Sequence, residues 1–312
     1  MIKKNKKRDK VLVLIQTFND GKFLLQAINS LLKQTYKNTD ILVLDDGSNN
    51  DNKKIYEKFV KTNKRIRYIY KKNTGIIESS IALMKIAKKS KYKYFAKMDG
   101  DDLSDKNRIK EQLIFLKKNN YDLVGCDYSR MNSKNKDFEY NKCTNNKIAR
   151  LNQLMVESIF AHGSILFKRS LLDKKILRYD SIYSKLPFPE DYNMFNNIIH
   201  KAKIGSINKP LYRYRIHNKS YSESNKTEYK KQLTIVSRLF FLKNKILFFR
   251  QNKNFISEDF FDLIIFFKIL LRNKLWNESK LLKIIYNNFT FKKIIQIVIY
   301  YFDRKIKKFL NV

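Results

Sequence analysis

Carboxylates that can hold a divalent cation gather in the stretch Asp99-Gly100-Asp101-Asp102, directly after residues 94–98, which predict a strand. Two carboxylates placed two residues apart on a turn can converge on one hard cation, and Gly100 allows backbone and ligand to approach closely. Mg²⁺ and Mn²⁺ prefer oxygen ligands and are commonly held by one or two carboxylates together with substrate phosphates. Solvated turns also contain this pattern, so its position after a buried strand is what favours a metal site.

Other polar groups have suitable chemistry. A carboxylate of Asp45-Asp46 can accept from a nucleobase N–H or a ribose hydroxyl, although such turns are common where strands end. Glu190 and Asp191 begin a predicted helix, where a carboxylate can be a general base or can simply interact with the helix dipole. His217 follows a strand that also contains two arginines, which bind phosphate well; His217 itself can bind a metal, donate a hydrogen bond or be structural.

The first half of the chain alternates short apolar segments with segments of helical periodicity. The predicted strands are residues 11–15, 41–44, 66–70, 94–98, 123–128, 165–168 and 211–215. The predicted helices are residues 23–32, 52–61, 76–88, 105–118 and 191–200, with Asp105 as an N-cap and residues 132–146 as a polar loop. Repeated β-α units imply a mostly parallel sheet flanked by helices, in which ligands bind beyond the carboxyl ends of the strands. The acidic residues that fall at such ends are Asp45, Asp46, Asp99 and Asp101.

The charge of the chain is extreme, since 66 basic and 29 acidic residues among 312 give a net charge of +37. Nucleic acid, an anionic membrane surface and phosphorylated substrates all attract such a protein, and the codon bias of an AT-rich genome produces the same composition. Two cysteines are too few for a disulfide framework, or for a zinc site without other ligands. No secretory signal and no run long enough to cross a bilayer is visible, so we expect a cytoplasmic protein.

Five linked motifs, in order over residues 9–222, resemble family 2 glycosyltransferases. The resemblance begins with residues 16–20, 30–36 and 43–48 and continues through residues 73–76 and 94–102. Later segments that resemble the family are His162-Gly163-Ser164, Glu190-Asp191-Tyr192 and Leu211-Tyr212-Arg213-Tyr214-Arg215-Ile216-His217.

The resemblance implies an α/β fold of the GT-A (Rossmann-like) type, with a mostly parallel central sheet between helices. Residues 1–224 are then the catalytic domain, with a nucleotide-sugar half at about 9–128 and an acceptor half at about 129–224. Residues 225–312 are expected to form a basic, aromatic-rich helical appendage. Residues 291–310 predict an amphipathic helix that either contacts an anionic membrane surface peripherally or packs on the catalytic domain.

The resemblance also implies roles for individual residues. Asp191 is expected to be the general base of an inverting transfer, and Asp46 is expected to face the nucleobase. The remaining expected ligands of the nucleotide-sugar are Thr17, Asn19, Asp99 and Glu190, and those of the metal, Mn²⁺ or Mg²⁺, are Asp101, Asp99 and His217. Gln16 and Asp20 depart from the family pattern, which has Pro and a basic residue at these positions.

The expected reaction moves a sugar from a nucleotide-sugar, with UDP favoured because Asp46 can accept the uracil N3–H, to a hydroxyl of a glycan or lipid-linked glycan. Analogy with the family suggests bacterial surface glycan synthesis, of lipopolysaccharide or capsule. The alternatives are a nucleic-acid-binding protein, a metal-dependent nucleotidyltransferase and an inactive binding module. The acids at the strand ends argue against a nucleic-acid partner.

Overall fold

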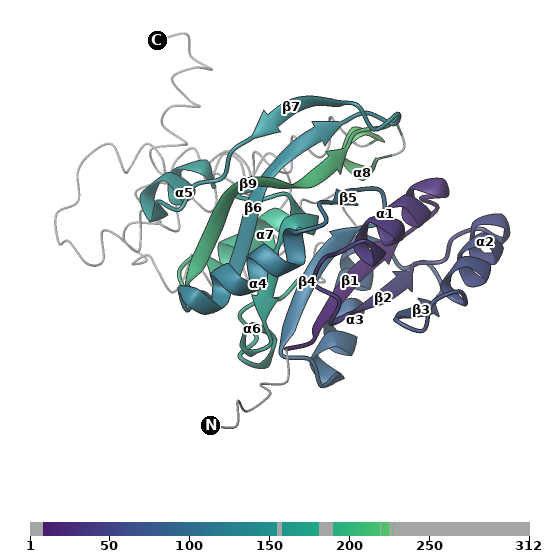
Figure 1. Cartoon of the computed structure of the whole chain (residues 1–312), viewed down its shortest axis with the longest axis horizontal. Coiled ribbons are helices and arrows are strands. Elements are labelled where there is room, and N and C mark those ends of the chain that lie inside the picture. Colours follow the sequence, from purple (N-terminus) through teal and green to yellow (C-terminus); the bar gives the residue numbers. More distant parts are fainter. Residues whose placement is uncertain (1–8, 155–157, 181–189, 219, 225–226, 228–312) are drawn as a thin grey trace, which may run out of the picture. The chain divides into compact units, whose positions relative to one another are not determined.

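A computed structural model describes residues 9–154, 158–180, 190–218, 220–224 and 227 of the chain (Figure 1). They belong to one compact unit that spans residues 1–233. Except for Thr227, the predicted appendage lies outside the described residues, so the boundary near residue 224 stays a prediction. Among the described residues, no helix combines the length and apolar character needed to cross a bilayer.

Strands and helices alternate through the first half of the chain, as the hydrophobic periodicity predicts (Figure 1). The strands are β1 (Val11–Thr17), β2 (Thr39–Asp45), β3 (Ile66–Tyr70), β4 (Tyr94–Asp99), β5 (Leu103–Ser104), β6 (Leu123–Met131), β7 (Asp137–Asn141), β8 (Leu166–Lys168) and β9 (Ile204–Arg215). The helices are α1 (Lys22–Leu32), α2 (Asn50–Val60), α3 (Ile76–Lys89), α4 (Arg108–Lys118), α5 (Lys147–Gln153), the 3₁₀ turn η1 (His162–Ser164), α6 (Ser170–Asp173), α7 (Glu190–Ile198) and α8 (Tyr221–Ser224).

The sheet runs in the order β3-β2-β1-β4-β8-β6-β9-β5, with β7 paired to β6. Strands β3, β2, β1 and β4 are parallel, which confirms the predicted α/β fold for the first half. The second half is mixed: β8 is antiparallel to β4 and β6, whereas β6 and β9 are parallel. The acceptor half therefore does not continue the simple β-α repeat.

The core lies on both faces of the parallel strands. Val11, Val13 and Ile15 of β1 pack in one cluster with α1 and α4, and the alternate residues Leu12 and Leu14 face the side of the sheet that α3 covers. Burial on both faces explains why β1 and β2 are continuous apolar runs rather than alternating ones.

Two local predictions are wrong. The predicted loop at residues 132–146 contains β7, an exposed strand whose polar sequence gives no hydrophobic alternation and which forms because its backbone pairs with β6. The predicted N-cap Asp105 lies before the helix, since α4 begins at Arg108 after the cap Asn107. Its carboxylate instead accepts from the N–H of Asn107 at 2.7 Å and shapes the approach to the helix.

Strand register places the acidic strand ends beside one another. Thr17 of β1 pairs with Asp45 of β2, and Gln16 pairs with Asp99 of β4. On the other side, Leu103 of β5 pairs with Arg213 of β9. The carboxyl ends of three parallel strands and the end of β9 therefore surround one region.

Candidate active site

The turn that follows β4 is anchored by Asp102, whose side chain is buried. Its carboxylate accepts hydrogen bonds from the hydroxyl of Tyr212 and from the backbone N–H of Arg215, each at 2.6 Å. Burial raises the pKa of Asp102 well above its ordinary value, and the nearby charges of Asp101 and Asp99 raise it further. Asp102, to which the sequence assigns no role, thus ties the acidic turn to β9.

The guanidinium of Arg215 is also structural. It donates from Nε to the carbonyl oxygen of Asp101 and from a terminal nitrogen to Gln26 Oε1 at 3.1 Å, and it stacks 4.3 Å from the ring centroid of Phe23. Arg213 pairs with Asp137 of β7 at 2.8 Å. The two arginines of β9, which could have bound phosphate, instead fix the loop and strand around the acidic turn.

Asp101 and His217 meet at the end of β9. Nε2 of His217 lies 3.0 Å from Oδ2 of Asp101, and the imidazole packs against Phe23 with ring centroids 5.0 Å apart. A carboxylate oxygen and a neutral imidazole nitrogen are a donor pair that suits Mn²⁺, with substrate phosphates as further ligands. In the described part of the chain, no group of three or more acidic, histidine or cysteine side chains is arranged to hold a metal. The donors present therefore fit a cation that binds together with its substrate.

Asp99 has a different neighbour. Its Oδ1 lies 3.7 Å from the ammonium of Lys97, a residue that is only 2% exposed, and its backbone N–H donates to the Tyr212 hydroxyl at 3.3 Å. Lys97 lies within β4, and burial of an amine is costly unless a carboxylate compensates it. The predicted metal ligands Asp99 and Asp101 thus have different neighbours, a lysine ammonium beside Asp99 and an imidazole beside Asp101.

Gly100 permits a close contact that involves Asp20. A Cβ atom at Gly100 would lie 2.1 Å from Oδ2 of Asp20, and that oxygen accepts from the hydroxyl of Thr17 at 2.6 Å. Burial raises the pKa of Asp20 well above its ordinary value, and Asp101 raises it further. Asp20 is thus a further carboxylate of the site; its only signal in the sequence is its departure from the family pattern.

The residues expected to bind the nucleotide lie in the loops after β1 and β2. Asn19, in a left-handed conformation with φ of 57°, donates its N–H to Ser48 Oγ at 2.9 Å. Asp46 is buried, and its Oδ1 binds the ammonium of Lys71 and accepts from the N–H of Thr74 at 2.9 Å. Asn19 is exposed, whereas the side chain of Asp46 is buried and that of its partner Lys71 is partly exposed.

The start of α7 brings Glu190 and Asp191 to the same region. Oδ2 of Asp191 accepts from the Ser158 hydroxyl at 2.8 Å, and burial raises the pKa of Asp191, with a smaller contribution from Asp99. Glu190 is buried, and burial, followed by the charge of Asp191, raises its pKa to about 8. Oε1 of Glu190 lies 3.6 Å from Nδ1 of His162.

His162 completes this cluster. Its Nε2 lies 2.6 Å from the hydroxyl of Tyr179, and burial, with the nearby charge of Lys97, lowers its pKa to about 3. The imidazole is therefore neutral at physiological pH and serves as a hydrogen-bonding group. Sequence reasoning placed His162 on the acceptor side but did not connect it to Glu190, because 27 residues separate them in the chain and no periodic pattern joins them.

The mixed α/β sheet flanked by helices is similar to the GT-A glycosyltransferase fold. Residues 12–175, more than half of the chain, match the family described as Glycosyl transferase family 2. The chain therefore belongs to glycosyltransferase family 2. This membership favours the transferase prediction over the nucleotidyltransferase and inactive-module alternatives.

Known proteins of similar sequence carry glycosyltransferase names. The O-antigen biosynthesis glycosyltransferase WbnJ of Escherichia coli is 27% identical over 221 residues, which cover 69% of this chain and 83% of WbnJ. An uncharacterized glycosyltransferase of Rickettsia felis is 32% identical over 217 residues, or 66% of this chain, but the chain spans only 33% of that protein. The crystal structure of S. aureus TarS 1–349 in complex with UDP-GlcNAc is similar in fold, with a TM-score of 0.58 at 16% identity over 84% of this chain and 73% of that one.

Proposed function

We propose that this enzyme is an inverting glycosyltransferase that moves a sugar from a UDP-sugar to a hydroxyl of a glycan or lipid-linked glycan in bacterial surface glycan synthesis. The observation that carries the proposal is that Asp101 with His217, Asp99 with Lys97, and α7 with its two carboxylates surround one site. The bound UDP-GlcNAc of TarS and the O-antigen role in the name of WbnJ support the choice of donor and pathway.

The nucleoside is assigned to the loops after β1 and β2. In this proposal Thr17, Asn19 and Asp46 line the nucleotide pocket, and Asp46 accepts the N3–H of uracil. All hydrogen bonds described above for the Asp46 side chain use Oδ1, which leaves Oδ2 for the base. Because Asp46 lies beneath Lys71, that lysine side chain must move when the base binds, and its ammonium is then available to a phosphate.

The diphosphate is assigned to the acidic turn. Asp101 and His217 would hold Mn²⁺ or Mg²⁺, which supplies charge neutralisation for the leaving diphosphate. Asp99 is assigned to the ribose or the donor sugar, and Lys97 orients the Asp99 carboxylate through their 3.7 Å contact. Glu190 is assigned to the donor sugar from the acceptor side of the site.

Asp191 is assigned as the general base. A base is most effective when its pKa lies near the working pH, and burial raises the pKa of Asp191. The pKa of about 8 for Glu190 keeps that residue protonated at neutral pH, so the negative charge of the pair resides on Asp191. As Asp191 takes the proton of the acceptor hydroxyl, the acceptor oxygen bonds to the anomeric carbon on the face opposite the nucleoside diphosphate. The bond from that carbon to the diphosphate oxygen breaks, and the configuration of the anomeric carbon inverts.

We further propose a cytoplasmic location and a peripheral contact with the membrane that presents the acceptor. The support is the amphipathic pattern of residues 291–310, which lie outside the described residues. Co-sedimentation with anionic liposomes tests this part separately, and an absence of binding at low salt would refute it.

Nucleotide release from UDP-, dTDP- and GDP-sugars in Mn²⁺ tests the donor. Asp191→Asn is expected to keep donor binding, measured by calorimetry, but to slow transfer by about 10²–10⁴-fold, the usual contribution of a general base. Asp51→Asn, on the exposed start of α2, removes the same charge away from the site and should leave the rate unchanged. An Asp191→Asn enzyme with the wild-type rate would show that the base is another residue.

A further inference from the structure

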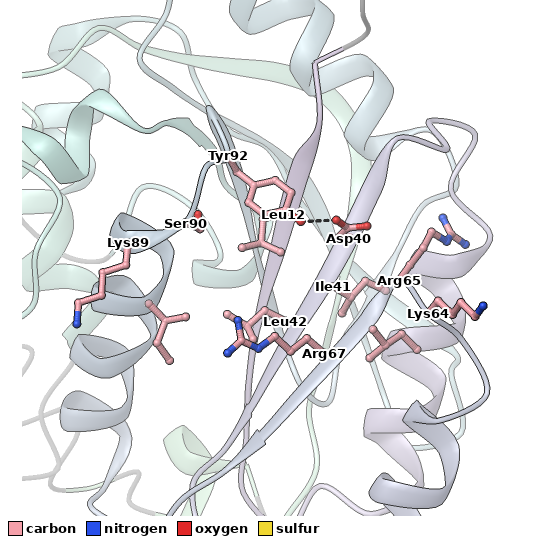
Figure 2. Close-up of a pocket in the computed structure, with 12 residues that line it drawn as sticks. Leu12, Asp40, Ile41, Leu42, Lys64, Arg65, Arg67, Lys89, Ser90 and Tyr92 are labelled. Atoms are coloured by element: carbon pink, nitrogen blue, oxygen red, sulfur yellow. Dashed lines mark hydrogen bonds between the residues drawn. The ribbon is translucent and has the colours of Figure 1, made fainter.

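A cavity of about 480 Å³ lies at the opposite edge of the sheet from the active site. It is lined by residues near the amino-terminal ends of β1, β2 and β3, among them Leu12, Asp40 and Ile66, and by the last turn of α3 (Figure 2). The active site uses the carboxyl ends of the same strands, so the two sites are separated by the length of the parallel strands. The volume lies within the range of small-molecule sites, about 300–1,000 Å³.

The floor of this cavity is apolar. Leu12 and Leu42 point to the face of the sheet that α3 covers, and α3 packs on β1 and leaves β3 beside the open space. Ile86 of α3 adds a second apolar wall. A fully hydrated anion gains little from such a surface, whereas a hydrocarbon group buries its own apolar area against it.

The polar lining of the cavity is cationic. Figure 2 shows the guanidinium of Arg67 reaching across the cavity toward α3, whereas the side chain of Lys89 extends from α3 away from Arg67, and Lys64 and Arg65 lie on the outer side. The one acidic lining residue, Asp40, is already compensated, since it pairs with Lys10 at 2.6 Å and accepts from the Tyr92 hydroxyl. Within the described part of the chain, no ion pair involves Arg67, Lys64 or Lys89.

The surroundings increase this positive potential. Further exposed lysines lie at the same edge, Lys88 in the last turn of α3 and Lys37, Lys61, Lys91 and Lys93 in the loops. Residues 228–312 contain more Lys and Arg than Asp and Glu, so electrostatic repulsion disfavours this chain's own tail as the occupant. A ligand with both negative charge and apolar surface complements the cavity.

We propose that this cavity binds a phosphorylated amphiphile, with its hydrocarbon part on Leu12, Leu42 and Ile86 and its phosphate on Arg67 and on Lys89, whose long side chain turns toward Arg67 when the ligand binds. A guanidinium suits this role because its fork of N–H donors matches two phosphate oxygens. The ligand reaches the site either from a bilayer or as a dissolved molecule, and the chemistry that recognises it is the same. The site is independent of sugar transfer, so its test does not depend on the proposed function.

Calorimetry of the full chain with dihexanoyl phosphatidic acid below its micelle concentration tests the dissolved form. Dihexanoyl phosphatidylcholine and inorganic phosphate are the comparison probes, and phosphatidylcholine vesicles with and without phosphatidic acid test the bilayer form. Arg67→Gln, alone and with Lys89→Gln, removes the proposed phosphate ligands. Lys85→Gln is the matched control, because Lys85 is exposed on α3 but does not line the cavity.

Phosphatidic acid, either dissolved or in vesicles, should bind at least tenfold more tightly than phosphatidylcholine presented in the same way. Dissolved phosphatidic acid should also bind at least tenfold more tightly than inorganic phosphate. Arg67→Gln should weaken binding at least tenfold, Lys85→Gln should not, and saturating UDP should change nothing. Binding of vesicles alone would identify a bilayer lipid, and binding of the dissolved lipid a free amphiphile; both support the proposal. It is overturned by an equal loss in Lys85→Gln, by equally tight binding of inorganic phosphate, by competition with UDP, or by no binding in either form.

Discussion

Replacement of Tyr212 by Phe removes one hydroxyl that holds three parts of the site together. That hydroxyl donates to Asp102 at 2.6 Å and accepts from the backbone N–H of Asp99 at 3.3 Å, while the Tyr212 ring lies 5.1 Å beneath the guanidinium of Arg108. Phe keeps the ring and its packing, so the change isolates the two hydrogen bonds.

The cost follows mainly from the burial of Asp102. Asp102 is fully buried and, among the described residues, its carboxylate keeps the Arg215 N–H as its one donor, while the N–H of the partly buried Asp99 loses its acceptor. An unsatisfied buried polar group costs about 1–3 kcal/mol, and the longer of the two bonds contributes less, so the expected loss of stability is about 2–3 kcal/mol. The acidic turn should also loosen, which raises the KM for the donor more than it lowers kcat.

Urea denaturation of both proteins measures the first effect, and nucleotide-release kinetics measure the second. Tyr70→Phe is the control, because the Tyr70 hydroxyl makes only a 3.4 Å contact with the Ser48 carbonyl at a side chain that is 40% exposed. It should change stability by less than about 0.5 kcal/mol, the usual range of surface substitutions. If Tyr212→Phe stays within that range too, the hydroxyl does not anchor the turn and the reasoning is refuted.

Three further predictions concern the same site. Asp101→Ala should abolish the Mn²⁺-dependent part of UDP binding in calorimetry, while UDP binding without metal persists. An unchanged effect of Mn²⁺ would show that other residues bind the metal. Because burial raises the pKa of Glu190 to about 8, the native state holds a proton that the unfolded chain has released, so its contribution to stability is present at low pH and is lost as the pH rises toward 8. Glu190→Gln should flatten a fall of about 2 kcal/mol between pH 6.5 and 8 in urea denaturation. His162 titrates only in the unfolded chain in this range, with an ordinary pKa of 6.5, and opposes the fall by about 0.4 kcal/mol in both proteins. An identical slope in both proteins would contradict the assignment. Gly100→Ala should cost about 1–3 kcal/mol, because its Cβ meets Asp20 at 2.1 Å; thermal unfolding equal to wild type would show that Asp20 moves freely.

Much of the fold could be predicted because its strands are buried on both faces. A strand such as residues 11–15 must then be a continuous apolar run, and this signal lies in adjacent residues. Strand β7 was not predicted, because it is exposed and its polar sequence has no hydrophobic pattern. It forms by backbone pairing with β6. The antiparallel insertion of β8 between β4 and β6 joins segments about 40 to 70 residues apart, and no local pattern specifies it.

The sequence by itself determined the class of enzyme and the edge of the sheet that holds the site. Parallel strands end at one edge, so acidic residues after β2 and β4 must lie near one another whatever the details of packing. This is why the sequence alone predicts that Asp46, Asp99 and Asp101 lie in one region.

Only the tertiary structure decided which side chains surround each acidic residue. Whether a carboxylate faces an ammonium, an imidazole or a tyrosine depends on side chains brought together from distant segments: Asp102 meets Tyr212 across 110 residues and Asp101 meets His217 across 116. Burial, which sets the raised pKa of Glu190 and the lowered pKa of His162, likewise belongs to the packed chain. Sequence spacing places residues along a strand, but the electrostatic environment of each carboxylate arises from desolvation and long-range contacts that exist only once the chain has folded.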